Sequence, residues 1–171
     1  MEAIRTYLEL PRPAAAAAAD PALDVRRLDG PTPAGYRRLY AAVGRAYRWV
    51  DRDAWSDDRL AAHLARADVS VWTLRDAGDV AGYFELERRV DDAGTTEVEI
   101  LYFGLVGPAL GRGLGRRLLE RAIAESWALG AERVVLNTCT LDHPAALPNY
   151  LARGFRVVRE ERYEVADEAA R

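Results

Sequence analysis

The sequence predicts a single domain of the α/β class. Strand-like stretches of apolar and β-branched residues alternate along the chain with stretches of helical spacing, and glycine or proline often stands between them. A length of 171 residues suits one domain rather than two. Half of the residues are apolar, which is enough to fill one sizeable core.

The N-terminal part of the chain divides into a tail and the first elements. Residues 1–22 hold three prolines and an alanine run, which supply helix breakers and little to bury. We therefore predict a flexible tail over 1–22 and one folded domain over 23–171. A short strand is expected over 23–28. The apolar spacing after Pro33 favours a helix, and Ser56 is a candidate N-cap of a second helix.

The middle of the chain is predicted to be mainly strand. A strand is expected over 69–75. The segments 80–90 and 95–105 flank a short turn and read as a β-hairpin, in which Gly94 supplies the positive φ that such turns need.

The C-terminal part begins with a glycine-rich segment, 107–115, that leads into a helix ending at Gly130. Pro148 lies inside the next helical segment, so that helix either begins late or kinks. The remaining expected elements are a buried strand, this helix and a last strand, over 134–136, 145–153 and 155–165.

The charged residues exclude several classes of protein. All 24 basic residues are arginine. Without lysine, the chain can form no Schiff base and no Walker-type phosphate loop. The net charge is −3 and no basic block is present, which argues against nucleic acid as a partner.

Other absences indicate the compartment and the chemistry. No apolar run approaches the roughly 20 residues that a bilayer-spanning helix needs, so we expect a cytoplasmic protein without membrane contact. Cys139 is the single cysteine, which excludes an intrachain disulfide. With only His63 and His143 in addition, no metal site is expected. Cys139 itself reads as a buried, inert thiol.

The glycine-rich segment has the composition of an anion-binding loop. Gly111, Gly113 and Gly115 stand between a strand and a helix, where unpaired backbone N–H groups and the helix dipole favour a phosphate. The dinucleotide fingerprint fails, because Arg116 occupies the place of its third glycine. A plain tight turn is the alternative interpretation of these glycines.

Two blocks of the sequence resemble the GNAT superfamily of N-acetyltransferases. The first is the loop Leu110-Gly111-Arg112-Gly113-Leu114-Gly115, which has both family glycines but leucine in the Gln/Arg position. The second block runs from His143 to Phe155, and His143 replaces the family asparagine. The positions of this block in family register are Ala146, Tyr150, Gly154 and Phe155. The resemblance spans roughly residues 23–165.

The resemblance implies a mixed, mostly antiparallel sheet with helices on both faces. Family members usually close with two strands, whereas only one is plain in this sequence. The resemblance also implies acetyl-CoA as the cofactor. The residues then expected to bind it are Leu105, Val106, Leu110, Gly111, Arg112, Gly113, Leu114, Gly115, Arg116, His143, Ala146 and Tyr150.

The resemblance further implies two catalytic residues. Glu99 lies where many members hold a glutamate that removes a proton from the amine through water. Tyr150 matches the tyrosine that protonates the departing thiolate, and a phenol is a suitable donor for a thiolate. The alternatives are a Glu99 that faces solvent and a Tyr150 that only packs in the core.

The acceptor is expected to be a primary amine of a small molecule or peptide. In the resembling family the first two helices and their connecting loop form the acceptor pocket. The residues expected there are Tyr47, Trp49, Asp51 and Arg52, joined by Tyr83 and Glu85 from the hairpin. The acids Asp51, Asp53 and Glu85 favour a cationic acceptor. A solvated loop with two aromatics tucked into the core is the alternative.

Two other functions compete with acetyl transfer. One is an acetyl-CoA-binding regulatory module without turnover, against which the presence of both Glu99 and Tyr150 argues. The other is an unrelated nucleotide-binding domain, against which the lack of lysine argues. The oligomeric state stays open, a homodimer included.

Overall fold

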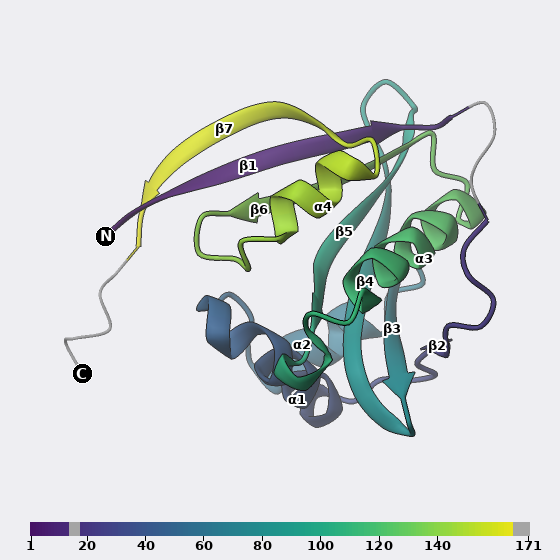
Figure 1. The fold of residues 1–171 in the computed structure, drawn as a ribbon, viewed down its shortest axis with the longest axis vertical. Coiled ribbons are helices and arrows are strands. Elements are labelled where there is room, and N and C mark those ends of the chain that lie inside the picture. The colour runs from purple at the N-terminus through teal and green to yellow at the C-terminus, as the bar shows by residue number, and fades with distance from the viewer. Residues whose placement is uncertain (14–17, 166–171) are drawn as a thin grey trace.

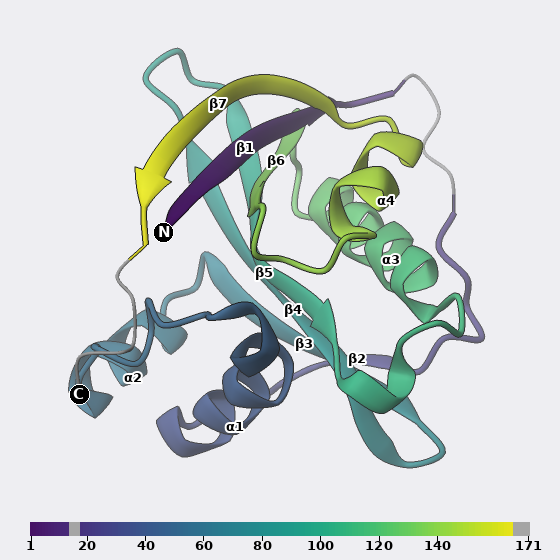
Figure 2. The same cartoon turned by 60° about the vertical axis from the view of Figure 1, so that its left-hand side comes forward.

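The computed structural model describes residues 1–13 and 18–165 and shows one seven-stranded sheet with helices on both faces (Figures 1 and 2). The strand order is β2-β3-β4-β5-β6-β1-β7, and β5–β6 is the parallel pair among antiparallel neighbours. The strands are β1 (Glu2–Pro11), β2 (Val25–Arg27), β3 (Val69–Asp76), β4 (Asp79–Val90), β5 (Thr96–Leu105), β6 (Arg133–Cys139) and β7 (Arg156–Glu164). The predicted mixed, mostly antiparallel sheet is confirmed.

The helices divide between the two faces of the sheet. Figure 2 shows α1 and α2 on one side and α3 and α4 on the other. Each layer has its own core, with Tyr36, Leu60 and Tyr83 in the first and Phe84 and Leu118 in the second. The helices are α1 (Pro33–Gly44), α2 (Asp57–Leu64), α3 (Leu114–Ala128) and α4 (Ala146–Ala152), with 3₁₀ turns η1 (Arg45–Tyr47) and η2 (Gly107–Ala109).

Local signals in the sequence placed several elements correctly. The Ser56 side chain accepts a hydrogen bond from the Arg59 N–H and caps α2 as predicted. Gly94 has φ +82° in the turn between β4 and β5, as the hairpin requires. Pro148 lies in the first turn of α4, where no backbone N–H is needed, so this helix begins late rather than kinks.

The N-terminus corrects the prediction of a flexible tail over 1–22. Residues 2–11 form β1, which lies between β6 and β7 and pairs with both (Figure 1). Ala3 and Leu8 are each only 1% exposed. Residues 14–17 of the expected tail lie outside the described residues, and Asp20 is held by Arg117 at 2.7 Å. The boundary expected at residue 22 is therefore wrong, because β1 belongs to the same sheet.

β1 also answers the question of the second closing strand. After Phe155 the described chain forms only β7, and β1 occupies the place between β6 and β7. Its side chains alternate between the two faces of the sheet, with Leu8 and Leu10 in the core beside α3 and α4 and Tyr7 on the opposite face. This alternation has the period of two that is typical of a strand, whereas the prediction of a tail rested on the prolines and alanines of the segment.

We expect Leu8→Ala to lower the free energy of unfolding by about 2–5 kcal/mol, because it leaves a cavity under a strand that is paired on both of its edges. Urea denaturation measures the change. Leu151→Ala removes a leucine that is 46% exposed and should stay within about 0.5 kcal/mol of the original protein. Equal stability of the two variants would mean that β1 does not hold the fold together.

Candidate active site

The two central strands separate at the middle of the sheet. β5 and β6 pair from Glu97 and Arg133 to Ile100 and Leu136, which form the last pair of the ladder. Leu101 forms a bulge in β5 at the same level. A cavity of about 790 Å³ opens where the strands diverge. The backbone edges that face it lack the neighbour strand that would otherwise pair with them.

The strand register divides the lining of this cavity into two sides. Directly paired residues share a face of a sheet. Tyr102 contacts Trp49 and therefore marks the side of α1 and α2, here called the α1 side. Register then places Glu99, Asn137, Cys139 and Arg5 on the α1 side as well. Phe103, Leu105 and Tyr150 lie on the other side, here called the α3 side.

The glycine loop borders the cavity on the α3 side. Gly111 and Gly113 have φ values of +74° and +73°, a conformation that glycine adopts readily. No heavy atom outside the neighbouring residues lies within 4 Å of a Cβ built on either of them. Gly113 is the N-cap of α3, so the free N–H groups of the first turn open onto this space. The loop therefore has the geometry of an anion cradle.

The individual loop residues differ in their roles. Leu110, Gly111, Gly115 and Arg116 line the cavity, and Arg116 is exposed. Two residues predicted to bind the cofactor point elsewhere. The Arg112 guanidinium pairs with Asp76 at the end of β3, and the Leu114 side chain lies in the core at 6% exposure. Neither side chain lines the cavity, and binding of the cofactor through the backbone of Arg112 and Leu114 stays a prediction.

The backbone groups that face the cavity differ from the predicted pair. The Val106 N–H donates to the Ala81 carbonyl at 2.9 Å and is not available, so its prediction is wrong. Backbone direction alternates along a strand, which turns the N–H groups of Leu105 and Phe103 toward the open edge. Leu105 thus keeps its predicted place, and Phe103 replaces Val106.

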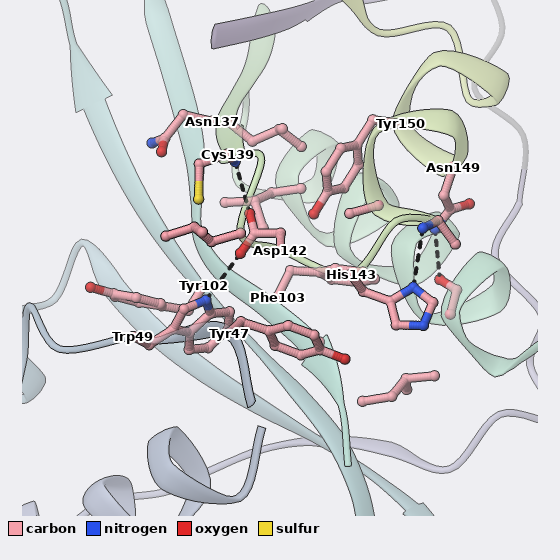
Figure 3. Close-up of a pocket in the computed structure, with 18 of the residues that line it drawn as sticks. Tyr47, Trp49, Tyr102, Phe103, Asn137, Cys139, Asp142, His143, Asn149 and Tyr150 are labelled. Carbon is pink, nitrogen blue, oxygen red and sulfur yellow. Dashed lines mark hydrogen bonds between the residues drawn. The ribbon is translucent and has the colours of Figure 1, made fainter. Parts of the chain in front are cut away.

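Tyr150 projects from α4 into the cavity. Its ring packs edge-on against Phe103 and Phe155 at 6.1 and 6.0 Å between centroids. Figure 3 shows its hydroxyl pointing into the cavity, on the side where Asp142 lies. Burial, and then the charge of Asp142, raise the pKa of Tyr150 above its ordinary value. The phenol therefore remains protonated near neutral pH and can act as a proton donor.

Asp142 joins the two sides of the cavity, and sequence reasoning missed it. One carboxylate oxygen accepts a hydrogen bond from Trp49 Nε1 at 3.2 Å (Figure 3). The other accepts from Thr138 Oγ1 at 2.7 Å and from the Cys139 N–H at 3.0 Å. Asp142 directly precedes His143, the first residue of the second motif block, and this was the one signal in the sequence that pointed to it. Asp142 ties the loop after η1 to the end of β6.

His143 has a structural and a lining role at once. Its Nδ1 accepts a hydrogen bond from the Ala145 N–H at 3.1 Å, and its carbonyl accepts from the Ala146 N–H at 2.8 Å. These bonds form the turn that leads into α4. The ring lines the cavity together with Ala146 and lies edge-on to Tyr47 at 6.2 Å.

Glu99 lies one residue before the point where β5 and β6 separate. Its side chain is 15% exposed, so the alternative of a solvent-facing glutamate is wrong. Its carboxylate forms an ion pair with Arg89 and lines the cavity. Burial raises the pKa of Glu99, and the opposing effect of Arg89 only moderates this shift.

The loop after η1 covers the cavity on the α1 side. Tyr47, Trp49, Asp51 and Arg52 all line it, as predicted, whereas Asp53 does not. Trp49 packs against Tyr40 and Tyr102 at 5.6 and 5.1 Å between ring centroids. Trp49 therefore both lines the cavity, as predicted, and packs against the core on the α1 side.

Tyr83 and Glu85 do not reach the cavity, which corrects their prediction as acceptor-binding residues. Both have 0% exposure and neither lines the cavity. Glu85 accepts hydrogen bonds from Arg52 at 3.1 Å and from the buried Tyr36 hydroxyl, and it lies 2.5 Å from His63 Nε2. A buried carboxylate needs such partners. Glu85 therefore anchors the loop through Arg52 instead of contacting an acceptor.

The chain ends contribute further lining residues that the sequence did not reveal. Arg5 of β1, Tyr163 of β7 and Val165 line the cavity on the α1 side. Cys139 is half-buried and lines the cavity as well, so this thiol is less buried than expected. In the described part of the chain, no helix is long and apolar enough to cross a membrane.

Comparisons with known proteins agree on one family. The model of the acetyltransferase (GNAT) family matches residues 36–155. A mycothiol acetyltransferase from Beutenbergia cavernae is 41% identical over 66 residues, which are 39% of this chain and 22% of that protein. The chain thus matches about a fifth of the length of this curated relative.

Solved structures share the fold. An aminoglycoside acetyltransferase from an uncultured soil metagenomic sample aligns at 20% identity with a TM-score of 0.64, over 87% of this chain and 99% of that chain. A GCN5-related N-acetyltransferase from Sphaerobacter thermophilus aligns at 17% identity with a TM-score of 0.63, over 94% of this chain and 51% of that chain. Together with the matching family model, which covers both motif blocks, these likenesses lead to one conclusion: the chain belongs to the GNAT acetyltransferase family.

Proposed function

We propose that the protein transfers an acetyl group from acetyl-CoA to a primary amine of a small molecule or peptide, by direct attack of the amine in a ternary complex. The observation that carries this proposal is the cavity between β5 and β6. It joins the glycine loop on the α3 side to an aromatic and charged wall on the α1 side. A two-substrate reaction needs both kinds of surface in one continuous space.

The α3 side fits acetyl-CoA. The open cradle at Gly111 and Gly113 and the N-terminus of α3 accept the pyrophosphate, and Arg116 adds a positive charge beside it. The N–H groups of Phe103 and Leu105 donate hydrogen bonds to carbonyl oxygens of the pantetheine and of the thioester. When bound, acetyl-CoA supplies an activated acetyl thioester.

The proton transfers belong to two residues on opposite sides of the cavity. Glu99, on the α1 side, accepts a proton from the ammonium group of the acceptor through water, since only a neutral amine is a nucleophile. Tyr150, on the α3 side, donates its phenolic proton to the departing sulfur. Asp142 lies near Tyr150, and its hydrogen bonds to Trp49 and to the Cys139 N–H link the loop after η1 to the end of β6.

The proposal is tested by measuring release of the CoA thiol from acetyl-CoA with a panel of primary amines. Amine-dependent thiol release supports it, and mass spectrometry of the product should show a mass gain of one acetyl group. Tight binding of acetyl-CoA without turnover of any amine would favour the regulatory module instead. Failure to bind acetyl-CoA would overturn the assignment of the glycine loop.

Gly115→Val should raise the KM for acetyl-CoA at least about 10-fold, because the added side chain enters the space of the pyrophosphate. Gly115 lines the cavity, has no positive φ, and a Cβ there would meet only Leu105 at 3.6 Å, so the fold should survive. Gly107→Ala is the control. Gly107 does not line the cavity, and a Cβ there would meet no heavy atom within 4 Å. Steady-state kinetics and circular dichroism measure both. An unchanged KM in folded Gly115→Val would contradict the cradle.

Glu99→Gln should lower kcat/KM about 10- to 1000-fold near neutral pH, the range typical for loss of a general base. The loss should shrink as rising pH deprotonates the amine in solution. Since the base acts when ionised and its pKa is raised, the acid limb of the original protein should lie above the ordinary range of a glutamate. Glu97→Gln is the control, because Glu97 is the second partner of Arg89 and does not line this cavity. An unchanged pH profile in Glu99→Gln would exclude Glu99 as the base.

Tyr150→Phe should lower kcat at every pH while leaving the KM for acetyl-CoA nearly unchanged, because it removes the proton donor and keeps the packing. The raised pKa of Tyr150 keeps the phenol protonated across the working range, so no recovery with pH is expected. Tyr7→Phe removes an exposed phenol outside the cavity and should behave like the original protein. Normal turnover by Tyr150→Phe would assign the proton to another donor.

A further inference from the structure

Arg5 presents a positive charge to the cavity from the N-terminal strand. Its guanidinium lies over the Tyr163 ring, 4.8 Å from the centroid, which fixes its position. It has no ion pair with a carboxylate of any residue that the structure describes. Three other arginines line the cavity. Arg52 is held by Glu85, Arg116 stands beside the glycine loop, and Arg48 directly follows η1 and has an interaction partner of its own. A guanidinium that has no carboxylate partner and lines a cavity is available to bind an anionic group of a ligand.

The register places Arg5 close to where the amine must react. Arg5 pairs with Cys139 on β6, two residues beyond Asn137, the first residue of β6 after its last pair with β5. Neighbouring strands lie about 4.8 Å apart and rise about 3.3 Å per residue, so the Cα atoms of Arg5 and Asn137 are about 8 Å apart. Arg5 and Asn137 also share the α1 side. A small acceptor held at the end of β6 can therefore reach both.

We propose that the acceptor carries a carboxylate as well as its amine, and that Arg5 binds this carboxylate and determines specificity. The acids Asp51, Asp53 and Glu85 were expected to favour a cationic acceptor. Two of them do not serve this purpose, because Glu85 is buried against Arg52 and Asp53 does not line the cavity. This proposal rests on the proposed acetyl transfer only for the position of the reacting amine.

The charge of the cavity selects a carboxylate over a phosphate. Asp51, Glu99 and Asp142 line the same cavity as Arg5, whereas the proposed pyrophosphate site lies on the α3 side at the glycine loop. These acids oppose a doubly charged anion at Arg5 more strongly than a singly charged one. A singly charged carboxylate matches one guanidinium, whose planar fork binds it through two parallel hydrogen bonds. The ammonium group of the same molecule then lies toward the acids. The acceptor class that fits is a small zwitterion, such as an amino acid or a short peptide with a free C-terminus.

The test compares acceptors in pairs that differ only in the carboxylate. The pairs are glycine and glycinamide, β-alanine and β-alaninamide, and glycylglycine and its amide. The proteins are the original chain, Arg5→Gln, and the matched control Arg159→Gln, which removes an arginine that lies 4.0 Å from the Tyr7 ring centroid and does not line this cavity. Acetyl transfer is measured by thiol release, and binding by titration calorimetry in the presence of saturating CoA.

We expect the carboxylate member of at least one pair to have a KM and a Kd about 10- to 100-fold lower than its amide, as charge-assisted hydrogen bonds provide. Arg5→Gln should abolish this difference with little change in kcat or in the KM for acetyl-CoA, and Arg159→Gln should keep it. Equal binding of acids and amides by the original protein, or an unchanged preference in Arg5→Gln, overturns the proposal. Carboxylate-selective binding without acetyl transfer supports the role of Arg5 and counts against the proposed function alone.

Discussion

The separation of β5 from β6 after Ile100 and Leu136 is the constraint on which the whole site depends. A continuous ladder would use the backbone groups of both strands and leave no space between the two layers of helices. The bulge at Leu101 and the change of direction that goes with it free one edge of each strand. The same event creates the cavity, supplies unpaired N–H groups on the α3 side, and brings Glu99 to its border.

Buried charge sets the position of the loop that covers the cavity on the α1 side. Glu85 has 0% exposure, and such a carboxylate is tolerated only because Arg52, His63 and Tyr36 surround it. The guanidinium of Arg52 also stacks on Trp55, with Cζ 3.9 Å from the ring centroid. The contacts of Arg52 with Glu85 and Trp55 together hold the loop against the sheet. Trp49 then reaches Asp142 across the cavity. The loop after η1 is thus held at two points, by Glu85 through Arg52 and by Asp142 through Trp49.

The sequence predicted what local chemistry determines. The cap at Ser56, the turn at Gly94 and the glycine loop each depend on a few consecutive residues, and the structure contains all three features. Pairing between distant strands carries no such local signal, so the place of β1 was missed. The direction of Glu85 depends on the register of β4 against its neighbours, and that of the Val106 N–H on its bond to Ala81.

The two sides of the cavity differ in how far local sequence signals determine them. The α3 side is built from two short blocks, around Gly111 and around Tyr150, so a cofactor could be proposed for it from motifs alone. The α1 side collects Arg5, the loop around Trp49, Glu99 and Tyr163, which lie up to 158 positions apart in the chain. The pairing of distant strands and the packing of this loop bring them together. The lining of the α1 side is therefore encoded in the tertiary arrangement, and β1 contributes to it through Arg5.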